Sequence, residues 1–165
     1  LDGDIDTENE SLAAMLEVLQ TRLREVLRED LGATYGVDVS ASVVDRPHSQ
    51  YSVAITFGSD PERVDELAGE VFAEIERLKN TPPQQAEVDA VTESFRRSYE
   101  LSLMENGFWL GQLVDSYERG TDPRRVLAYE ESLTGITPDG VQQTALRYFD
   151  LENYVQISLL PEDSE

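Results

Sequence analysis

The sequence predicts an α+β domain in which an antiparallel sheet is covered on one face by packed helices. Long stretches place apolar residues at helical spacing. Two shorter stretches, 37–43 and 51–57, alternate apolar and polar residues, as half-buried strands do. A short polar loop joins them, which predicts a hairpin. Because the strands are consecutive and most helices follow them, α+β fits better than a doubly wound α/β fold.

The opening helix is predicted to begin at Ser11 and to end near Gly32. Its apolar stripe comprises Leu12, Met15, Leu16, Leu19, Leu23, Val26 and Leu27. Residues 1–10 are acidic and have no periodicity, so we expect a disordered terminus or linker there. The domain itself is predicted over residues 11–162, with a short tail at 163–165.

Proline, glycine and asparagine mark the later helix boundaries. Asp60-Pro61 is predicted to start a helix that ends at Asn80. Thr81 and Gln84 stand at capping-box spacing and are predicted to start the next helix, which runs to about Met104. The remaining signals are a break at Asn106-Gly107, an end near Gly120, and starts at Asp122-Pro123 and Thr137-Pro138.

A closing strand is predicted over residues 154–160, where Pro161 ends it. Three strands are few for so many helices. We therefore expect the sheet to lack members that lie upstream of Leu1, and the chain to be a fragment of a larger domain.

The charge balance excludes one class of partner. Thirty-four acidic residues face thirteen basic ones, which gives a net charge of −21. Such a chain is not expected to bind nucleic acid through its phosphates. Lys79 is the single lysine, and high acidity with scarce lysine is typical of proteins from salt-rich surroundings, so a halophilic source is a hypothesis. The chain contains no run of about 18 apolar residues, and no membrane span is expected.

The chain has little chemistry of its own. It contains no cysteine, and His48 is its single histidine, so a zinc site or a nucleophilic triad cannot be assembled from it in the usual way. A phosphate-binding glycine motif is also missing from the sequence. We therefore expect no catalytic residue and no metal ligand within this chain.

One corner of the predicted fold offers a specific hypothesis. Arg28 lies at the end of the opening helix, and Tyr35 follows seven residues later, past the Gly32 turn. A cation and a phenol presented together could bind a peptide backbone. The alternative is structural: Arg28 pairs with Glu25 or caps the helix end, and Tyr35 packs beneath the first strand.

The segment VLREDLGATYGVDVSA resembles the LRE-x-LG-x-x-Y-x-V-x-S segment of the insulinase/pitrilysin zinc metallopeptidases. The likeness continues through SDPERVDELAGEVFAEIERL, the Asn106-aromatic-Trp109 stretch and the closing LLPE, and covers residues 11–162. It is nearest to the bacterial pitrilysin-like proteases, which implies a periplasmic location. The family's H-x-x-E-H zinc motif is absent. The resemblance therefore implies a C-terminal domain of a zinc endopeptidase that is inactive alone, with zinc held by a catalytic domain of the same polypeptide or of a partner subunit.

The resemblance also implies substrate-binding roles for Arg28 and Tyr35, since family members use an arginine and a tyrosine at this spacing to reach the catalytic domain. Arg28 would donate to a peptide carbonyl or C-terminal carboxylate, and Tyr35 to the oxyanion formed during peptide hydrolysis. Phe108 and Trp109 are interpreted as core anchors, with a role in lining the peptide chamber as the alternative. Two alternatives to the peptidase interpretation remain: a non-catalytic scaffold or peptide-presenting subunit of the same fold, and a free-standing acidic binding module.

Overall fold

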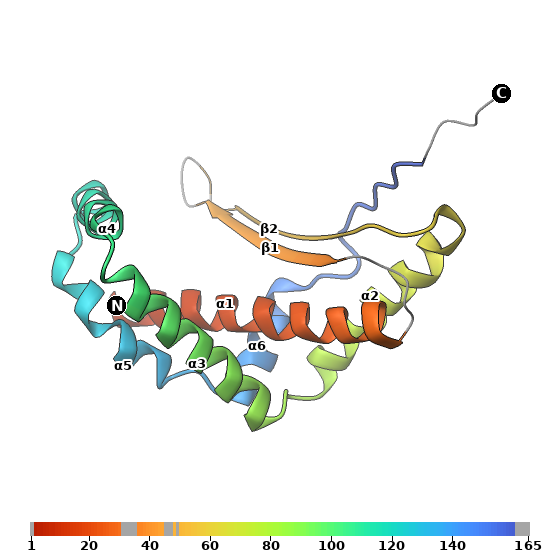
Figure 1. Ribbon diagram of the computed structural model, residues 1–165, viewed down its shortest axis with the longest axis horizontal. Coiled ribbons are helices and arrows are strands. Elements are labelled where there is room, and N and C mark those ends of the chain that lie inside the picture. Colours follow the sequence, from red (N-terminus) through yellow and green to blue (C-terminus); the bar gives the residue numbers. More distant parts are fainter. Residues whose placement is uncertain (1, 31–35, 45–47, 49, 161–165) are drawn as a thin grey trace.

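The computed structural model describes residues 2–30, 36–44, 48 and 50–160, with the backbone alone for 2–9 and 28–30. Helices predominate, and one hairpin interrupts them (Figure 1). The α-helices are α1 (Asp2–Arg24), α2 (Val64–Asn80), α3 (Gln85–Ser102), α4 (Asn106–Arg119), α5 (Tyr129–Leu133) and α6 (Pro138–Tyr148). The other elements are the π-helix η1 (Glu25–Asp30), the 3₁₀ helices η2 (Pro61–Arg63) and η3 (Pro123–Ala128), and the strands β1 (Val37–Val44) and β2 (Gln50–Phe57). None of the helices in this described part is long and apolar enough to cross a membrane.

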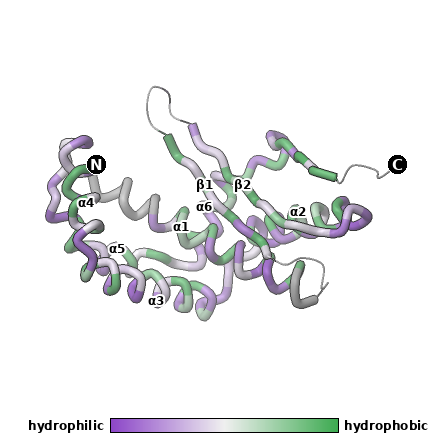
Figure 2. Tube along the Cα trace, turned by 45° about the horizontal axis from the view of Figure 1, so that its top comes forward, coloured by the Kyte–Doolittle hydropathy of each residue, from purple (hydrophilic) through white to green (hydrophobic). Residues whose placement is uncertain are grey.

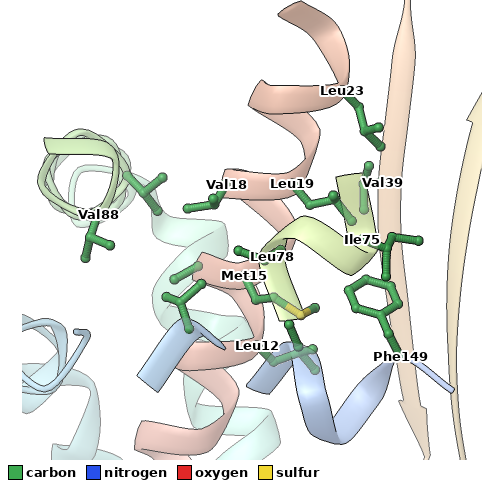
Figure 3. Packing of buried hydrophobic residues seen from close by; sticks show 14 of the residues in the cluster. Leu12, Met15, Val18, Leu19, Leu23, Val39, Ile75, Leu78, Val88 and Phe149 are labelled. Carbon is green, nitrogen blue, oxygen red and sulfur yellow. The ribbon is translucent and has the colours of Figure 1, made fainter. Parts of the chain in front are cut away.

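Helix α1 is the centre of the packing. It contacts β1 on one side and α2, α3, α5 and α6 on the others, and Figure 1 shows it between the hairpin above and the α3 and α5 helices below. The predicted stripe is buried: Met15, Leu19, Leu23 and Leu27 have no exposed surface. Figure 3 shows α1 side chains directed at Val39 of β1 and at Ile75 and Leu78 of α2. Each such side chain contributes about 1.5–3 kcal/mol on burial, so this stripe holds the layers together.

The hairpin confirms the α+β prediction. Strands β1 and β2 pair antiparallel, and the register sets Val39 opposite Ile55 and Val37 opposite Phe57. These side chains lie on one face and join the core around α1, while Asp38, Ser40 and their neighbours on the other face are exposed. A two-residue period therefore gives the hairpin one face for the helices and one for solvent.

Two of the predicted helix starts have their caps. Thr137 Oγ1 accepts a hydrogen bond from the Gly140 amide at 3.1 Å, and Asp122 Oδ1 accepts one from the Arg124 amide at 2.9 Å. The predicted capping box at Thr81 is wrong by one turn. Gln84 is the N-cap of α3, and its amide donates to Glu87 Oε2 at 2.7 Å. Two prolines, at 82 and 83, lie between Thr81 and the helix, and both positions stay outside it.

The start of α1 also differs from the expectation. The helix begins at Asp2, so residues 2–10 are helical where a disordered terminus or linker was predicted. Acidic side chains near a helix N-terminus interact favourably with the helix dipole, so the composition that resembles a linker also suits a first turn. Helix α1 contacts α5, whose first residue is Tyr129. Burial, and to a smaller extent the nearby Glu10 carboxylate of α1, raise the pKa of Tyr129 to about 12. The division of the chain at residue 11 remains a prediction.

The predicted closing strand is wrong for the structure as described. Residues 154–160 have no regular secondary structure, and the alternating Val155, Ile157 and Leu159 are 85%, 81% and 94% exposed. The segment leaves the body near the C-terminus, with hydrophobic stretches visible along it in Figure 2. The described sheet is the two-stranded hairpin, and residues 154–160 pair with neither of its edges. Tyr154 is the first residue of this segment, and its ring packs edge-on against the ring of Phe72, with the two centroids 4.9 Å apart.

Candidate functional site: the corner between α1 and β1

The corner begins with an unusual helical segment. Residues 25–30 form the π-helix η1, which extends α1 by six residues and contains the backbone of Arg28. π-helical turns are rare, and they occur frequently at functional sites. The Arg28 side chain and all of Tyr35 lie outside the described residues, so the predicted pairing of the two groups stays a prediction.

The structure does show how both sides of the corner are fixed. Leu27 is fully buried and Val26 is half-buried, and η1 contacts α2. On the strand side, the Val39 amide donates to Gln20 Oε1 of α1 at 2.9 Å. The helix before the corner and the strand after it are thus tied to the same core.

An ion-pair network joins the last turns of α1 to α2 and α3. Arg22 Nε and Nη2 donate to the two carboxylate oxygens of Glu87 at 2.7 and 3.0 Å. Arg22 Nη1 donates to Glu74 Oε1 at 3.3 Å, and Arg77 donates to the second oxygen of Glu74. The network joins α1 to α2 and α3 one turn before η1. Its bidentate Arg22–Glu87 pair fixes orientation as well as distance.

The electrostatics of the network follow from these hydrogen bonds. The Arg22 guanidinium lowers the pKa of Glu87 below its usual value of 4.5, and the Glu87 carboxylate raises the pKa of Arg22 in return. Glu74 is only 2% exposed, so its charge depends on the two arginines for compensation.

The network was not among the sequence predictions, although the sequence contains a signal for it. Glu74 falls within the apolar stripe of α2, between Val71 and Leu78. A carboxylate at an inward helical position requires a cationic partner, because an unpaired buried charge is strongly destabilising. The partner could not be deduced, since Arg22 lies 52 residues away along the chain.

A half-open groove of about 330 Å³ lies beside the network, between α1 and α3. Its walls are mostly apolar and come from Val18 and Thr21 on α1 and from Ala86, Ala90 and Val91 on α3. The volume is at the lower end of the range for small-molecule pockets. Glu87 at its edge is already committed to Arg22, so the groove offers apolar contact but little directional chemistry.

A zinc ion does not fit the residues that the structure describes. That part of the chain has no cluster of three or more His, Cys, Asp or Glu side chains able to hold a metal ion. His48 lies exposed in the turn between β1 and β2. Zinc sites in proteins use nitrogen and sulfur ligands held in a tetrahedral cage, and this chain offers a single imidazole and no thiol.

Comparison with known proteins decides the family. A model described as "Peptidase M16 inactive domain" matches residues 4–95, more than half of the chain, including α1, the corner, the hairpin, α2 and most of α3. The chain belongs to this M16 family. The resemblance to insulinase/pitrilysin peptidases is thereby confirmed. So is the expectation that this domain is the non-catalytic part of a zinc protease family.

Relatives of this M16 domain are much longer proteins. The zinc protease PQQL-like of Arabidopsis thaliana is 24% identical over 178 residues, which cover 98% of this chain and 19% of the relative. The periplasmic protease PqqL from Escherichia coli has a TM-score of 0.71 at 22% identity, over 86% of this chain and 16% of that one. A mutant of the ferredoxin protease FusC, solved in complex with Arabidopsis ferredoxin, has a TM-score of 0.72 at 20% identity. The match covers 88% of this chain and 16% of the FusC chain. At these identities the solved structures establish the fold alone.

Proposed function

We propose that this M16 domain binds peptide substrate for a zinc endopeptidase whose metal is held elsewhere, in the same polypeptide or in a partner subunit. The observation that carries the proposal is the family match over residues 4–95, which contains the corner between α1 and β1. The zinc protease named among its relatives is consistent with this role. The chain spans about a fifth of that protein, which leaves room for a separate catalytic domain.

In this proposal Arg28 and Tyr35 meet the substrate. The Arg28 guanidinium would donate to a peptide carbonyl or terminal carboxylate, where its planar fork gives direction as well as charge. The Tyr35 hydroxyl would donate to the oxygen that gains negative charge as the peptide carbonyl is attacked. The buried anchors on either side of the corner, Leu27 and Val39, support the proposal because groups that stabilise a transition state must be held in advance.

Photo-crosslinking tests the proposal. Tyr35→benzoylphenylalanine would be placed in the longer peptidase and irradiated with a fluorescein-labelled unfolded casein peptide. We expect the label to appear on this domain, because position 35 would lie against bound peptide. The matched control replaces Tyr154, which is 56% exposed and lies at the start of the C-terminal segment. Equal labelling from positions 35 and 154 would contradict the assignment.

A scaffold role is the second candidate, since the family description itself calls the domain inactive. In that case the chain would present peptides or hold an assembly without contributing to hydrolysis. An H-x-x-E-H motif in the same polypeptide or its partner favours the peptidase, and its absence favours the scaffold.

The compartment and the wider sheet belong to the proposal as well. PqqL from Escherichia coli is described as periplasmic, and we propose the same location for this protein. We also propose that the β1–β2 hairpin belongs to a larger sheet of the longer polypeptide, because an isolated two-stranded hairpin is only marginally stable in water. FusC was solved with a ferredoxin, so a protein as well as a short peptide is a substrate class to test.

The charge of the chain gives a separate prediction about salt. At a net charge of −21, self-repulsion opposes the compact state, and added salt screens it. If the protein comes from a salt-rich environment, its Tm should rise steadily between low and molar KCl. Thermal melting followed by circular dichroism measures this. A Tm that stays constant or falls over the same range would remove the halophilic hypothesis.

A further inference from the structure

Helix α4 has one face that packs on the rest of the chain. Phe108, Trp109 and Gln112 are half-buried and Ser116 is buried. The Trp109 indole donates to the Leu103 carbonyl at 2.9 Å, and the Phe108 ring lies edge-on to Tyr99 with centroids 6.1 Å apart. At 100° per residue, the four α4 positions fall within a sector of about 100°. On this inner face Phe108 and Trp109 thus contact neighbouring residues at this end of the chain, but neither belongs to the core cluster around α1, so their interpretation as core anchors stays a prediction.

A second apolar face lies on the opposite side of α4. Leu110, Leu113, Val114 and Tyr117 stand at helical spacing i, i+3, i+4 and i+7, and they are 65%, 45%, 47% and 84% exposed. We call these four residues the outer face of α4. The outer face is apolar at all four of these positions, whereas the inner face is mixed, because Gln112 and Ser116 are polar. Within the described chain only the inner face is covered.

The position of α4 separates the outer face from the corner. Helix α4 lies at the end of the molecule near the N-terminus of α1, with η3 as its main contact among the other described elements (Figure 1). The π-helix η1 is at the far end of α1, which has 23 residues and so is about 35 Å long. A peptide held at Arg28 would have to be extended over about ten residues to reach the outer face.

We propose that the outer face of α4 docks against another folded domain of a longer M16 polypeptide. This chain corresponds to 16% of the PqqL and FusC chains, so in proteins of that size most of the mass lies outside it and must pack somewhere. A contiguous apolar face on a surface helix marks a protein interaction site. The face is a row of exposed side chains along one helix, and the groove between α1 and α3 lies elsewhere. A ridge packs into a folded surface, whereas a peptide side chain needs a concavity.

Like the proposed function, this docking proposal assumes that the domain is part of a longer peptidase polypeptide. It does not depend on the roles of Arg28 and Tyr35. Cysteine labelling in that longer polypeptide tests it, because residues 1–165 contain no cysteine of their own. Tyr117→Cys places a thiol on the outer face. Leu146→Cys is the control, since Leu146 on α6 is 47% exposed and lies outside that face. Each labelling rate with N-ethylmaleimide is divided by the rate of the same variant in guanidinium, and peptide mass mapping locates the label.

We expect labelling at position 117 to be about tenfold or more slower than at position 146, because a docked face is shielded from the reagent. The protection should not change when the protein is diluted a hundredfold. Equal rates at the two positions would overturn the proposal. Protection lost on dilution would assign the face to a second copy, and protection that appears only with added casein peptide would assign it to substrate; both outcomes also overturn it.

A second pair of variants uses charge instead of a thiol. Leu113→Glu, at a position 45% exposed, should increase the radius of gyration of the longer polypeptide measured by small-angle X-ray scattering, while Leu146→Glu should leave it unchanged. Arg28→Ala separates the two proposals. An unchanged rate of peptide hydrolysis in Arg28→Ala would remove the substrate role and leave the protection at position 117 as the measure of docking.

Discussion

Replacing Arg28 with alanine in the zinc-bearing peptidase is expected to lower kcat/KM by about ten- to a thousandfold, on the scale of losing one donor to a developing oxyanion. The guanidinium would contribute a charged, directional hydrogen bond to the peptide, and alanine offers neither charge nor donor. Because Arg28 sits in the π-helix η1, whose neighbours Leu27 and Val26 pack into the core, the backbone should tolerate the truncation. Steady-state hydrolysis of an unfolded peptide, followed with substrate below KM, measures the effect.

Tyr35→Phe completes this experiment. The change removes a single hydroxyl and keeps the ring, so a loss of activity isolates the hydrogen bond. If the phenol meets only the transition state, kcat and kcat/KM should fall together while KM stays constant. Arg24→Ala is the matched control for Arg28, since Arg24 is an exposed arginine in the last turn of α1. Unchanged kcat/KM in both Arg28→Ala and Tyr35→Phe would remove the roles assigned to these residues.

Most elements of the fold could be predicted because their signals are local. The stripe from Leu12 to Leu27 has the period of a helix, and the alternation in β1 and β2 has the period of a strand. The two elements that differ depend on context. Residues 2–10 have a composition that suits both a linker and a helix start, and the continuing helix decides between them. Residues 154–160 have a strand pattern, but a strand forms only where its backbone pairs with a neighbouring strand, and the alternation does not identify that neighbour.

The candidate site was less predictable, for a similar reason. The spacing of Arg28 and Tyr35 identified the corner through its resemblance to a family, and the family is now shown. The network around Arg22 joins residues up to 65 positions apart, so no local rule could pair Arg22 with Glu87. Glu74 at an inward position of α2 was the one local clue. The outer face of α4 is likewise visible only when burial separates its apolar residues from those of the inner face.

Replacing Arg22 with alanine is expected to lower the free energy of unfolding by about 3 kcal/mol, the lower end of the cost of breaking a buried ion pair. The change removes the bidentate bonds to Glu87 and the bond to Glu74. It leaves the Glu74 carboxylate buried with Arg77 as its remaining partner in the network. The free energy of unfolding of Arg22→Lys should lie between those of wild type and Arg22→Ala. An ammonium group keeps the charge but lacks the planar fork that meets both Glu87 oxygens. Urea unfolding at pH 7, followed by circular dichroism, gives the free energies.

The pH dependence of the same variants supplies the sharper test. Since Arg22 holds the pKa of Glu87 below 4.5, the stability from this pair is fully present above about pH 4.5 and is lost as the pH falls through the lowered value. Other carboxylates titrate in both proteins, so the informative quantity is the difference in free energy of unfolding between wild type and Arg22→Ala. This difference should become smaller below about pH 4.5. Arg97→Ala is the control, because Arg97 is 73% exposed and pairs with Glu93 along the surface of one helix, where ion pairs contribute little. Equal losses of stability in Arg22→Ala and Arg97→Ala, or a gap between wild type and Arg22→Ala that is constant with pH, would show that this network does not hold α1 against α2 and α3.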